Sequence, residues 1–110
     1  MSWLAIPGCL LVIAVVAVAH AAGELTEPER RGEALLTRQC ARCHAVGRTD
    51  TGQHPEAPLF RTLSRRYPIE ALEEALGEGL LSGHPDMPEF EFSAGEVGDI
   101  VSYLNAIQER

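Results

Sequence analysis

Apolar residues follow two different patterns along this chain of 110 residues. Near the amino terminus they form one nearly continuous run, from Trp3 to Ala19. After residue 22 they recur every three or four positions, which is the spacing of an amphipathic helix. The clearest stripe near the carboxyl terminus consists of Val97, Ile100, Val101, Leu104 and Ile107. The pattern predicts an apolar leader followed by one small helical domain.

Capping signals predict where two of the helices begin. Thr26 and Glu29 have the spacing of a capping box, and so do Ser93 and Glu96. We expect the first helix to run to about Gln39, and the last helix to follow the apolar stripe.

The segment between these two helices predicts a third helix that begins after Pro68 and ends at Gly77 or Gly79. Its expected buried side consists of Ile69, Leu72, Ala75 and Leu76. A short helical turn fits residues 59–65, whereas 45–58 and 81–92 have the Gly and Pro content of loops. No segment predicts a convincing strand, so the expected fold class is all-α.

Gly32 lies inside the first predicted helix. A glycine there costs up to about 1 kcal/mol relative to alanine, so it needs a structural reason. We expect the last helix to approach closely at this point, with Tyr103 or Leu104 lying over the glycine.

The apolar run at the amino terminus predicts export. It is followed by Ala19-His20-Ala21, the small-x-small pattern that a signal peptidase recognises. Its seventeen residues are at the lower limit of what can span a bilayer. We therefore expect residues 1–21 to be a cleaved signal peptide and 22–110 to be the working domain. An uncleaved anchor, which would tether the protein to a membrane, is the alternative. Either way, the most consistent location is the periplasm.

The net charge of the chain indicates which kinds of partner it can bind. The chain carries nine basic residues, all of them arginine, and sixteen acidic ones, for a net charge of −7. This sign disfavours a nucleic-acid partner, because phosphate binding requires positive charge. It favours a soluble protein, or one that docks onto a basic partner surface.

The sequence "CARCH" holds the main candidate chemistry, with thiols at Cys40 and Cys43 and an imidazole at His44. A disulfide across two residues would close a tiny loop and stabilise little. A thioredoxin-like site needs this motif at a helix start within a βαβ pattern, and strands are not predicted. A zinc site needs four ligands, and ligation by both Cys43 and His44 is awkward. The remaining interpretation is attachment of a c-type haem, with two thioether bonds and the histidine beneath the iron.

Met87 is the candidate for the opposite axial position on the iron. It is the only methionine after the leader, and Pro85 and Pro88 restrict the loop around it. A methionine of this kind could instead fill the core. His84, three residues earlier, is the competing iron ligand.

Four segments resemble the small monohaem class I cytochromes c of bacteria, and together they cover nearly all of residues 24–108. They are "RGEALLTRQCARCHAVG", "APLFRTL", "GHPDMPEF" and "VGDIVSYLNAIQ". The resemblance implies a fold in which the terminal helices cross and loops wrap one covalently attached haem c. It implies thioether bonds at Cys40 and Cys43, and axial iron ligands at His44 and Met87. It also implies that the Pro58 carbonyl accepts a hydrogen bond from His44.

With both axial positions filled, such a centre exchanges single electrons without binding a small-molecule substrate. We therefore expect an electron carrier between protein redox partners, not an enzyme. One alternative is a dedicated haem subunit of a dehydrogenase or oxidase. The other is a haem enzyme or gas sensor with a labile sixth ligand. Candidate haem-covering residues are Leu59, Phe60, Leu63, Ile69, Leu72, Leu76, Phe90 and Phe92, and candidate propionate partners are Arg48, Arg61, Arg65 and Arg66.

Overall fold

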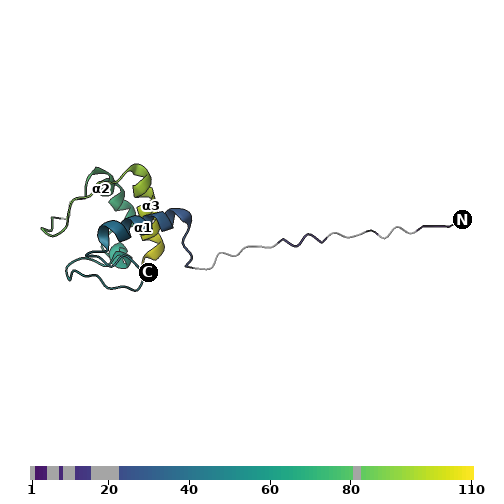
Figure 1. The fold of residues 1–110 in the computed structure, drawn as a ribbon, viewed down its shortest axis with the longest axis horizontal. Helices are drawn as coiled ribbons and strands as arrows, with labels where there is room; N and C mark the ends of the chain where they lie inside the picture. Colours follow the sequence, from purple (N-terminus) through teal and green to yellow (C-terminus); the bar gives the residue numbers. More distant parts are fainter. Residues whose placement is uncertain (1, 5–7, 9–11, 16–22, 81–82) are drawn as a thin grey trace.

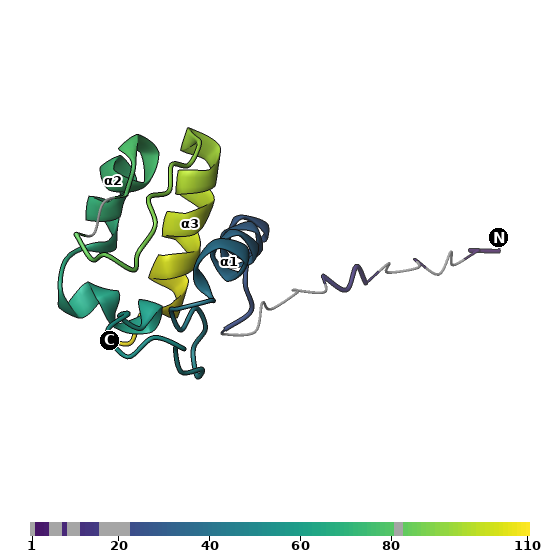
Figure 2. The same cartoon turned by 60° about the vertical axis from the view of Figure 1, so that its left-hand side comes forward.

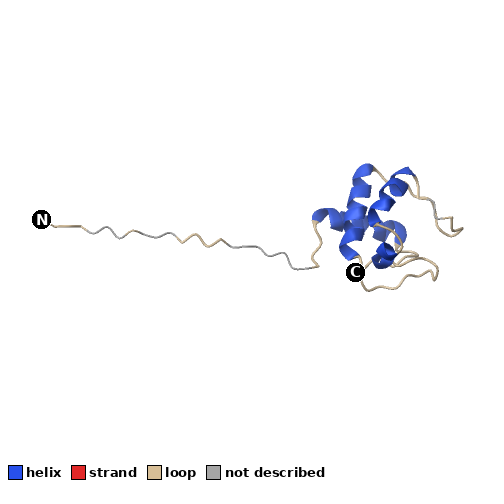
Figure 3. Cartoon of the chain, turned by 180° about the vertical axis from the view of Figure 1, so that it is seen from behind, coloured by secondary structure: helices blue, strands red, loops and turns tan. Residues whose placement is uncertain are grey.

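A computed structural model describes residues 2–4, 8, 12–15, 23–80 and 83–110. Its elements in chain order are α1 (Glu27–Cys40), the 3₁₀ helices η1 (Phe60–Arg65) and η2 (Ile69–Ala71), α2 (Leu72–Glu78) and α3 (Ala94–Ile107). Figure 3 shows the helices gathered together, with long loops on one side. The described part of the chain has no strand, and Leu80 and Phe90 pair only as an isolated antiparallel bridge. The all-α prediction is confirmed.

Both capping boxes form as expected. The Glu29 carboxylate accepts a hydrogen bond from the Thr26 N–H at 2.7 Å, and the Glu96 carboxylate accepts one from the Ser93 N–H at 2.9 Å. In return, the Thr26 and Ser93 hydroxyls accept from the N3 backbone N–H groups. Helix α1 ends one residue beyond the expected Gln39, so that Cys40 closes the helix.

The middle helix differs in detail from the prediction. After Pro68 the chain forms the single 3₁₀ turn η2, and it becomes α-helical only at Leu72. The helix ends at Gly79, whose φ of 114° is open to glycine but strained for other residues. Gly77 therefore lies within α2 instead of ending it.

Helices α1 and α3 cross, as Figures 1 and 2 show from two sides, and the two backbones approach closely at Gly32. A Cβ atom added at Gly32 would lie 2.1 Å from the carbonyl oxygen of Asp99 and 2.9 Å from the Cβ of Tyr103. Close approach of α3 is thus the reason for the glycine, and the expected contact with Tyr103 is present. The nearest atoms belong to Asp99, which the sequence does not predict, and Leu104 is not among the three nearest atoms. The Asp99 carboxylate also accepts two hydrogen bonds from the Arg31 guanidinium, at 2.8 and 2.9 Å.

The core lies between the crossed helices and the short helical turns. Its buried members include Leu36, Phe60, Leu63, Ile69, Leu76, Phe92, Ile100 and Leu104. Tyr103 is 2% exposed, and its hydroxyl donates a hydrogen bond to the Val46 carbonyl at 2.8 Å. Burial raises the pKa of Tyr103 to about 12, with the carboxylates of Glu33 and Asp50 adding to the effect. This bond fixes the start of the loop 45–58 against α3.

The predicted signal peptide, residues 1–21, lies largely outside the described residues. Its described members include Trp3 and Val15, and both side chains are exposed. Within the described segments, no helix is both long enough and apolar enough to cross a membrane.

Candidate functional site

The sequence "CARCH" follows directly from the end of α1. The N–H groups of Cys43 and His44 both donate to the Cys40 carbonyl, at 3.1 and 2.9 Å, so the chain turns tightly after the helix. Cys40 and Cys43 are half-buried and are not joined in a disulfide. Burial raises the pKa of Cys40 to about 11, and the neighbouring Cys43 adds to the shift. The turn therefore holds both thiols and the imidazole close together at one end of α1.

His44 is oriented by a backbone acceptor. Its Nδ1–H donates to the Pro58 carbonyl at 2.8 Å, and its ring packs on Phe60 with 4.7 Å between centroids. A proton on Nδ1 leaves the Nε2 lone pair of the neutral imidazole available for a metal. The accepting carbonyl is that of Pro58, the residue that the resemblance implies.

The loop 45–58 folds back onto the attachment segment. The His54 N–H donates to the Cys43 carbonyl at 3.1 Å, and the Phe60 N–H donates to the Ala45 carbonyl at 3.0 Å. At Gly52 the backbone passes so close that an added Cβ would lie 2.7 Å from the Cys43 oxygen. The first loop and the thiol-bearing turn therefore form one tightly bonded unit.

Met87 is half-buried and lies in the second of the two long loops predicted from the sequence, 81–92, whereas 45–58 is the first. The loop is closed at its base by the bond from the Leu80 N–H to the Phe90 carbonyl at 2.8 Å. The Met87 N–H donates to the His84 carbonyl at 3.2 Å, and the His84 ring contacts Glu56 of the first loop. The structure thus brings Cys40, Cys43, His44 and Pro58 together directly, and brings the Met87 loop to them through contacts between the two loops.

Two contacts join these donors to apolar side chains, because Phe60 packs on the His44 ring and Cys40 packs against the hydrophobic core. Of the predicted covering residues, Phe60, Leu63, Ile69, Leu76 and Phe92 are buried, and Leu59, Leu72 and Phe90 are half-buried. Two thiols and one imidazole nitrogen are the donors that a covalently attached haem requires, and the Met87 thioether is the candidate for the remaining axial position. The residues present therefore fit the cofactor that the sequence predicts.

Two of the predicted propionate partners have other contacts. Arg61 is mostly buried, donates to the Asp50 carbonyl at 2.6 Å, and pairs with Glu109 at 3.2 Å. Arg65 pairs with the same Glu109 carboxylate at 3.1 Å. These arginines thus join the first loop and η1 to the carboxyl-terminal end of the chain.

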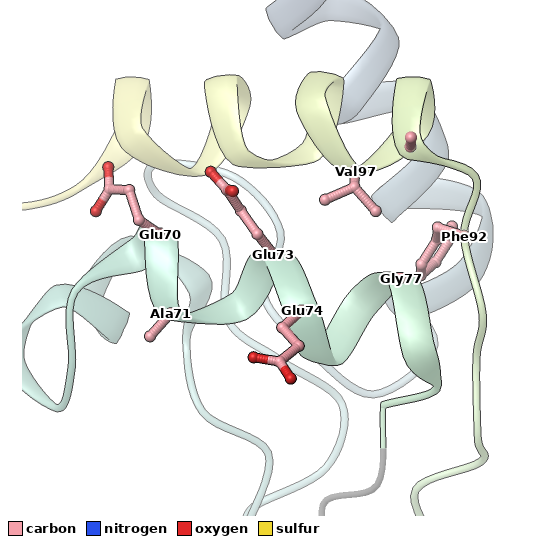
Figure 4. Close-up of a pocket in the computed structure, with 8 residues that line it drawn as sticks. Glu70, Ala71, Glu73, Glu74, Gly77, Phe92 and Val97 are labelled. Carbon is pink, nitrogen blue, oxygen red and sulfur yellow. The ribbon is translucent and has the colours of Figure 1, made fainter.

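A separate groove lies between α2 and α3 (Figure 4). It is lined by Glu70, Glu73 and Glu74 together with Phe92 and Val97. None of its lining residues belongs to the attachment segment, so this acidic groove is distinct from the thiols and the imidazole.

Comparisons with known proteins identify the family. The family model described as "Cytochrome C oxidase, cbb3-type, subunit III" matches residues 27–104. Cytochrome c-552 of Bradyrhizobium diazoefficiens is 34% identical over 101 residues, which are 92% of this chain and 93% of that protein. The chain belongs to the c-type cytochromes. No solved structure gave a significant match.

As a c-type cytochrome, the protein carries covalently bound haem c and transfers electrons to and from protein partners. The predicted family, all-α fold, cofactor and electron-carrier role are confirmed, and the protein is an electron carrier instead of an enzyme. Haem supplies a couple that gains and loses one electron. The chain's own contribution is to hold donor atoms in fixed places and to limit the access of water to them.

Three further residues that connect the two loops were not identified from the sequence. His54, Glu56 and Asp86 join the two loops, with the His54 Nε2 atom 3.0 Å from an Asp86 carboxylate oxygen. A signal was present in the sequence, because "HPEAP" at 54–58 and "HPDMP" at 84–88 share one pattern.

Proposed function

We propose that His44 Nε2 and Met87 Sδ are the two axial iron ligands, and that Cys40 and Cys43 carry the thioether bonds. The observation that most supports this is the 2.8 Å hydrogen bond from His44 Nδ1 to the Pro58 carbonyl. It fixes the tautomer and orientation that a metal-binding histidine needs, on the residue that directly follows the second thiol.

Filling both axial positions defines the chemistry. With no open position on the iron, the centre exchanges electrons without binding a substrate. A thioether ligand and an apolar cover both favour the reduced state, and so raise the reduction potential. The rigid bonding of the loop 45–58 to the attachment segment keeps His44 in place in both oxidation states, which lowers the cost of electron transfer.

The ligand assignment is tested by replacing Met87 with alanine. We expect Met87→Ala to lower the potential and to let the reduced protein bind carbon monoxide, which wild type excludes. If Met87→Ala excludes carbon monoxide as wild type does, then Met87 is not the ligand. The rival assignment, in which His84 is the ligand, predicts instead that Met87→Ala retains its sixth ligand and that His84→Ala loses it completely.

We further propose that residues 1–21 direct export and that the domain 22–110 works in the periplasm. The apolar run and the Ala19-His20-Ala21 pattern support this, and c-type cytochromes are typically exported proteins. The mass of the mature protein decides between cleavage, which gives a soluble domain, and retention, which gives a membrane tether. An unprocessed chain recovered from the cytoplasm would contradict export.

The partner is a larger redox protein with a basic docking surface. The net charge of −7 supports this, because opposite charges speed diffusional encounter. The leading proposal is a mobile shuttle. The family description names an oxidase subunit, which favours a permanently bound subunit as the second candidate. Purification from native membranes in mild detergent separates the two, since a shuttle elutes alone and a subunit elutes with its complex.

A further inference from the structure

The two loops that flank the site contain the same five-residue pattern, His-Pro-acid-x-Pro, at 54–58 and 84–88. Both copies fold into the same turn. The N–H of Ala57 donates to the His54 carbonyl, and the N–H of Met87 donates to the His84 carbonyl, each at 3.2 Å. Proline suits the second position of such a turn because its φ is already fixed near the required value. Met87 thus occupies the place in the second turn that Ala57 occupies in the first.

Each turn also orients its own histidine ring. The Glu56 N–H donates to His54 Nδ1 at 3.1 Å, and the Asp86 N–H donates to His84 Nδ1 at 3.2 Å. A ring nitrogen that accepts a hydrogen bond carries no proton, so the proton of each neutral imidazole is on Nε2. Both Nε2–H groups are therefore donors that point away from their own turns.

These donors pair reciprocally across the two loops. His54 Nε2 contacts the Asp86 carboxylate at 3.0 Å, and His84 Nε2 contacts the Glu56 carboxylate at 2.5 Å. The two rings meet edge to face, with 5.4 Å between their centroids. We call these four side chains, His54, Glu56, His84 and Asp86, the loop clasp.

The loop clasp connects the segments that carry the two proposed axial ligands. On one side, the His54 N–H bonds to the Cys43 carbonyl, and Pro58 in the same turn accepts from His44. On the other side, Asp86 directly precedes Met87. We propose that the four clasp residues are positioning residues that hold the Met87 loop against the His44 loop, and so keep the Met87 thioether on the iron. This inference rests on the proposed axial role of Met87.

The exposure of the clasp shows where its effect should be measured. The Glu56 and Asp86 side chains are about two-thirds exposed, at 67% and 65%. Exposed pairs of this kind contribute little to global stability. A thioether is a weak ligand, however, and a small loss of loop restraint shifts the balance between bound and dissociated Met87. Ligand exchange at the iron is therefore the sensitive readout, and unfolding is not.

A divalent-cation site is the other interpretation of the same cluster, since ligand atoms of His54, His84 and Asp86 lie within 4.8 Å of one another. A neutral histidine that binds a metal through Nε2 carries its proton on Nδ1. Here both Nδ1 atoms accept backbone N–H groups. The geometry thus favours hydrogen bonds between the loops over a bound cation.

The test uses the oxidised holoprotein and measures the affinity for free imidazole, which displaces Met87 from the iron. We expect His54→Ala to raise this affinity about tenfold, because the fraction of protein with Met87 dissociated increases. His54→Gln should restore most of the wild-type affinity, since the glutamine amide places an N–H near the position of Nε2. Glu91→Ala, an exposed change of the same loop with no clasp contact, should match wild type.

A double-mutant cycle tests the pairing itself. His54→Ala and Asp86→Ala should be non-additive, since each removes the same hydrogen bond. Fully additive effects, or an unchanged imidazole affinity in His54→Ala, would overturn the clasp. Zinc that binds wild type in the absence of imidazole, and that no longer binds Asp86→Ala, would overturn it in favour of a cation site. All of these results presuppose Met87 ligation in wild type, which the ferric charge-transfer band of methionine-bound haem reports separately. Absence of that band contradicts the proposed axial pair itself.

Discussion

The imidazole of His44 and the carbonyl of Pro58 are joined by a hydrogen bond of 2.8 Å across fourteen residues of chain. The bond ties the attachment segment to the far end of the loop 45–58. Because the acceptor is a backbone oxygen, it keeps its position whatever the side chain at residue 58. Pro58 therefore contributes through the position of its backbone carbonyl and through the restricted backbone of proline.

This leads to a prediction for Pro58→Ala. The carbonyl remains, so the visible spectrum and the axial ligands should not change. The free energy of unfolding should fall by only about 0.4–1 kcal/mol, because alanine gives the unfolded chain more freedom. Chemical denaturation followed by Soret absorbance measures this. Loss of the low-spin spectrum in Pro58→Ala would show that the side chain itself is required.

The helix crossing gives a second prediction. Gly32→Ala places a methyl group 2.1 Å from the Asp99 oxygen, so α1 and α3 must separate. We expect a loss of about 3 kcal/mol in stability, at the upper end of overpacking costs.

Gly98→Ala is the matched control for this crossing. Gly98 is interior to α3 and has open space where the Cβ would lie, so its replacement should stabilise the protein by about 0.5–1 kcal/mol. Thermal unfolding of the two variants should move in opposite directions. Equal shifts would mean that the crossing does not depend on Gly32.

The raised pKa of Tyr103 predicts that the protein loses stability at alkaline pH. Its pKa is about 12 in the folded protein and near 10 when exposed, so the unfolded chain loses the phenol proton first. The free energy of unfolding should therefore fall as the pH rises from 10 to 12, by about 2 kcal/mol.

Tyr103→Phe isolates this effect from other alkaline changes. The variant should be less stable at pH 7, by about 1–2 kcal/mol, because the Val46 carbonyl loses its donor. The difference between the two proteins should then shrink between pH 10 and 12. A difference that stays constant over this range would contradict the assigned pKa.

Ionic strength should control the encounter with redox partners. At a net charge of −7, electron transfer with a basic partner should slow about tenfold between roughly 10 mM and 200 mM salt, because the Debye length shrinks from about 30 Å to below 10 Å. Stopped-flow mixing with a cationic and an anionic redox protein measures this. An equal salt dependence for both partners would contradict electrostatic docking.

Local signals were enough to predict the helices and the attachment segment. Thr26 and Ser93 cap helices through contacts three residues away, and "CARCH" is contiguous. Gly32 also indicated a close helix contact. The sequence did not identify its partner Asp99, because the rotation of one helix against another depends on the whole interface.

The contacts between the two loops were not predicted. His54 and Asp86 are thirty-two residues apart, and each looks like an ordinary polar loop residue by itself. Only the shared pattern of "HPEAP" and "HPDMP" connects them, and a pattern does not reveal that two turns face each other. Likewise, the sequence made Arg61 a candidate propionate partner, but it did not predict the pairing of Arg61 with Glu109 at the carboxyl-terminal end.

The axial pair of His44 and Met87 can be observed by proton NMR of the reduced holoprotein, because the ring current of haem shifts a ligand methyl group far upfield. We expect one strongly upfield-shifted methionine methyl signal, which disappears in Met87→Ala. A reduced protein without such a signal, or one that keeps it in Met87→Ala, would contradict the account.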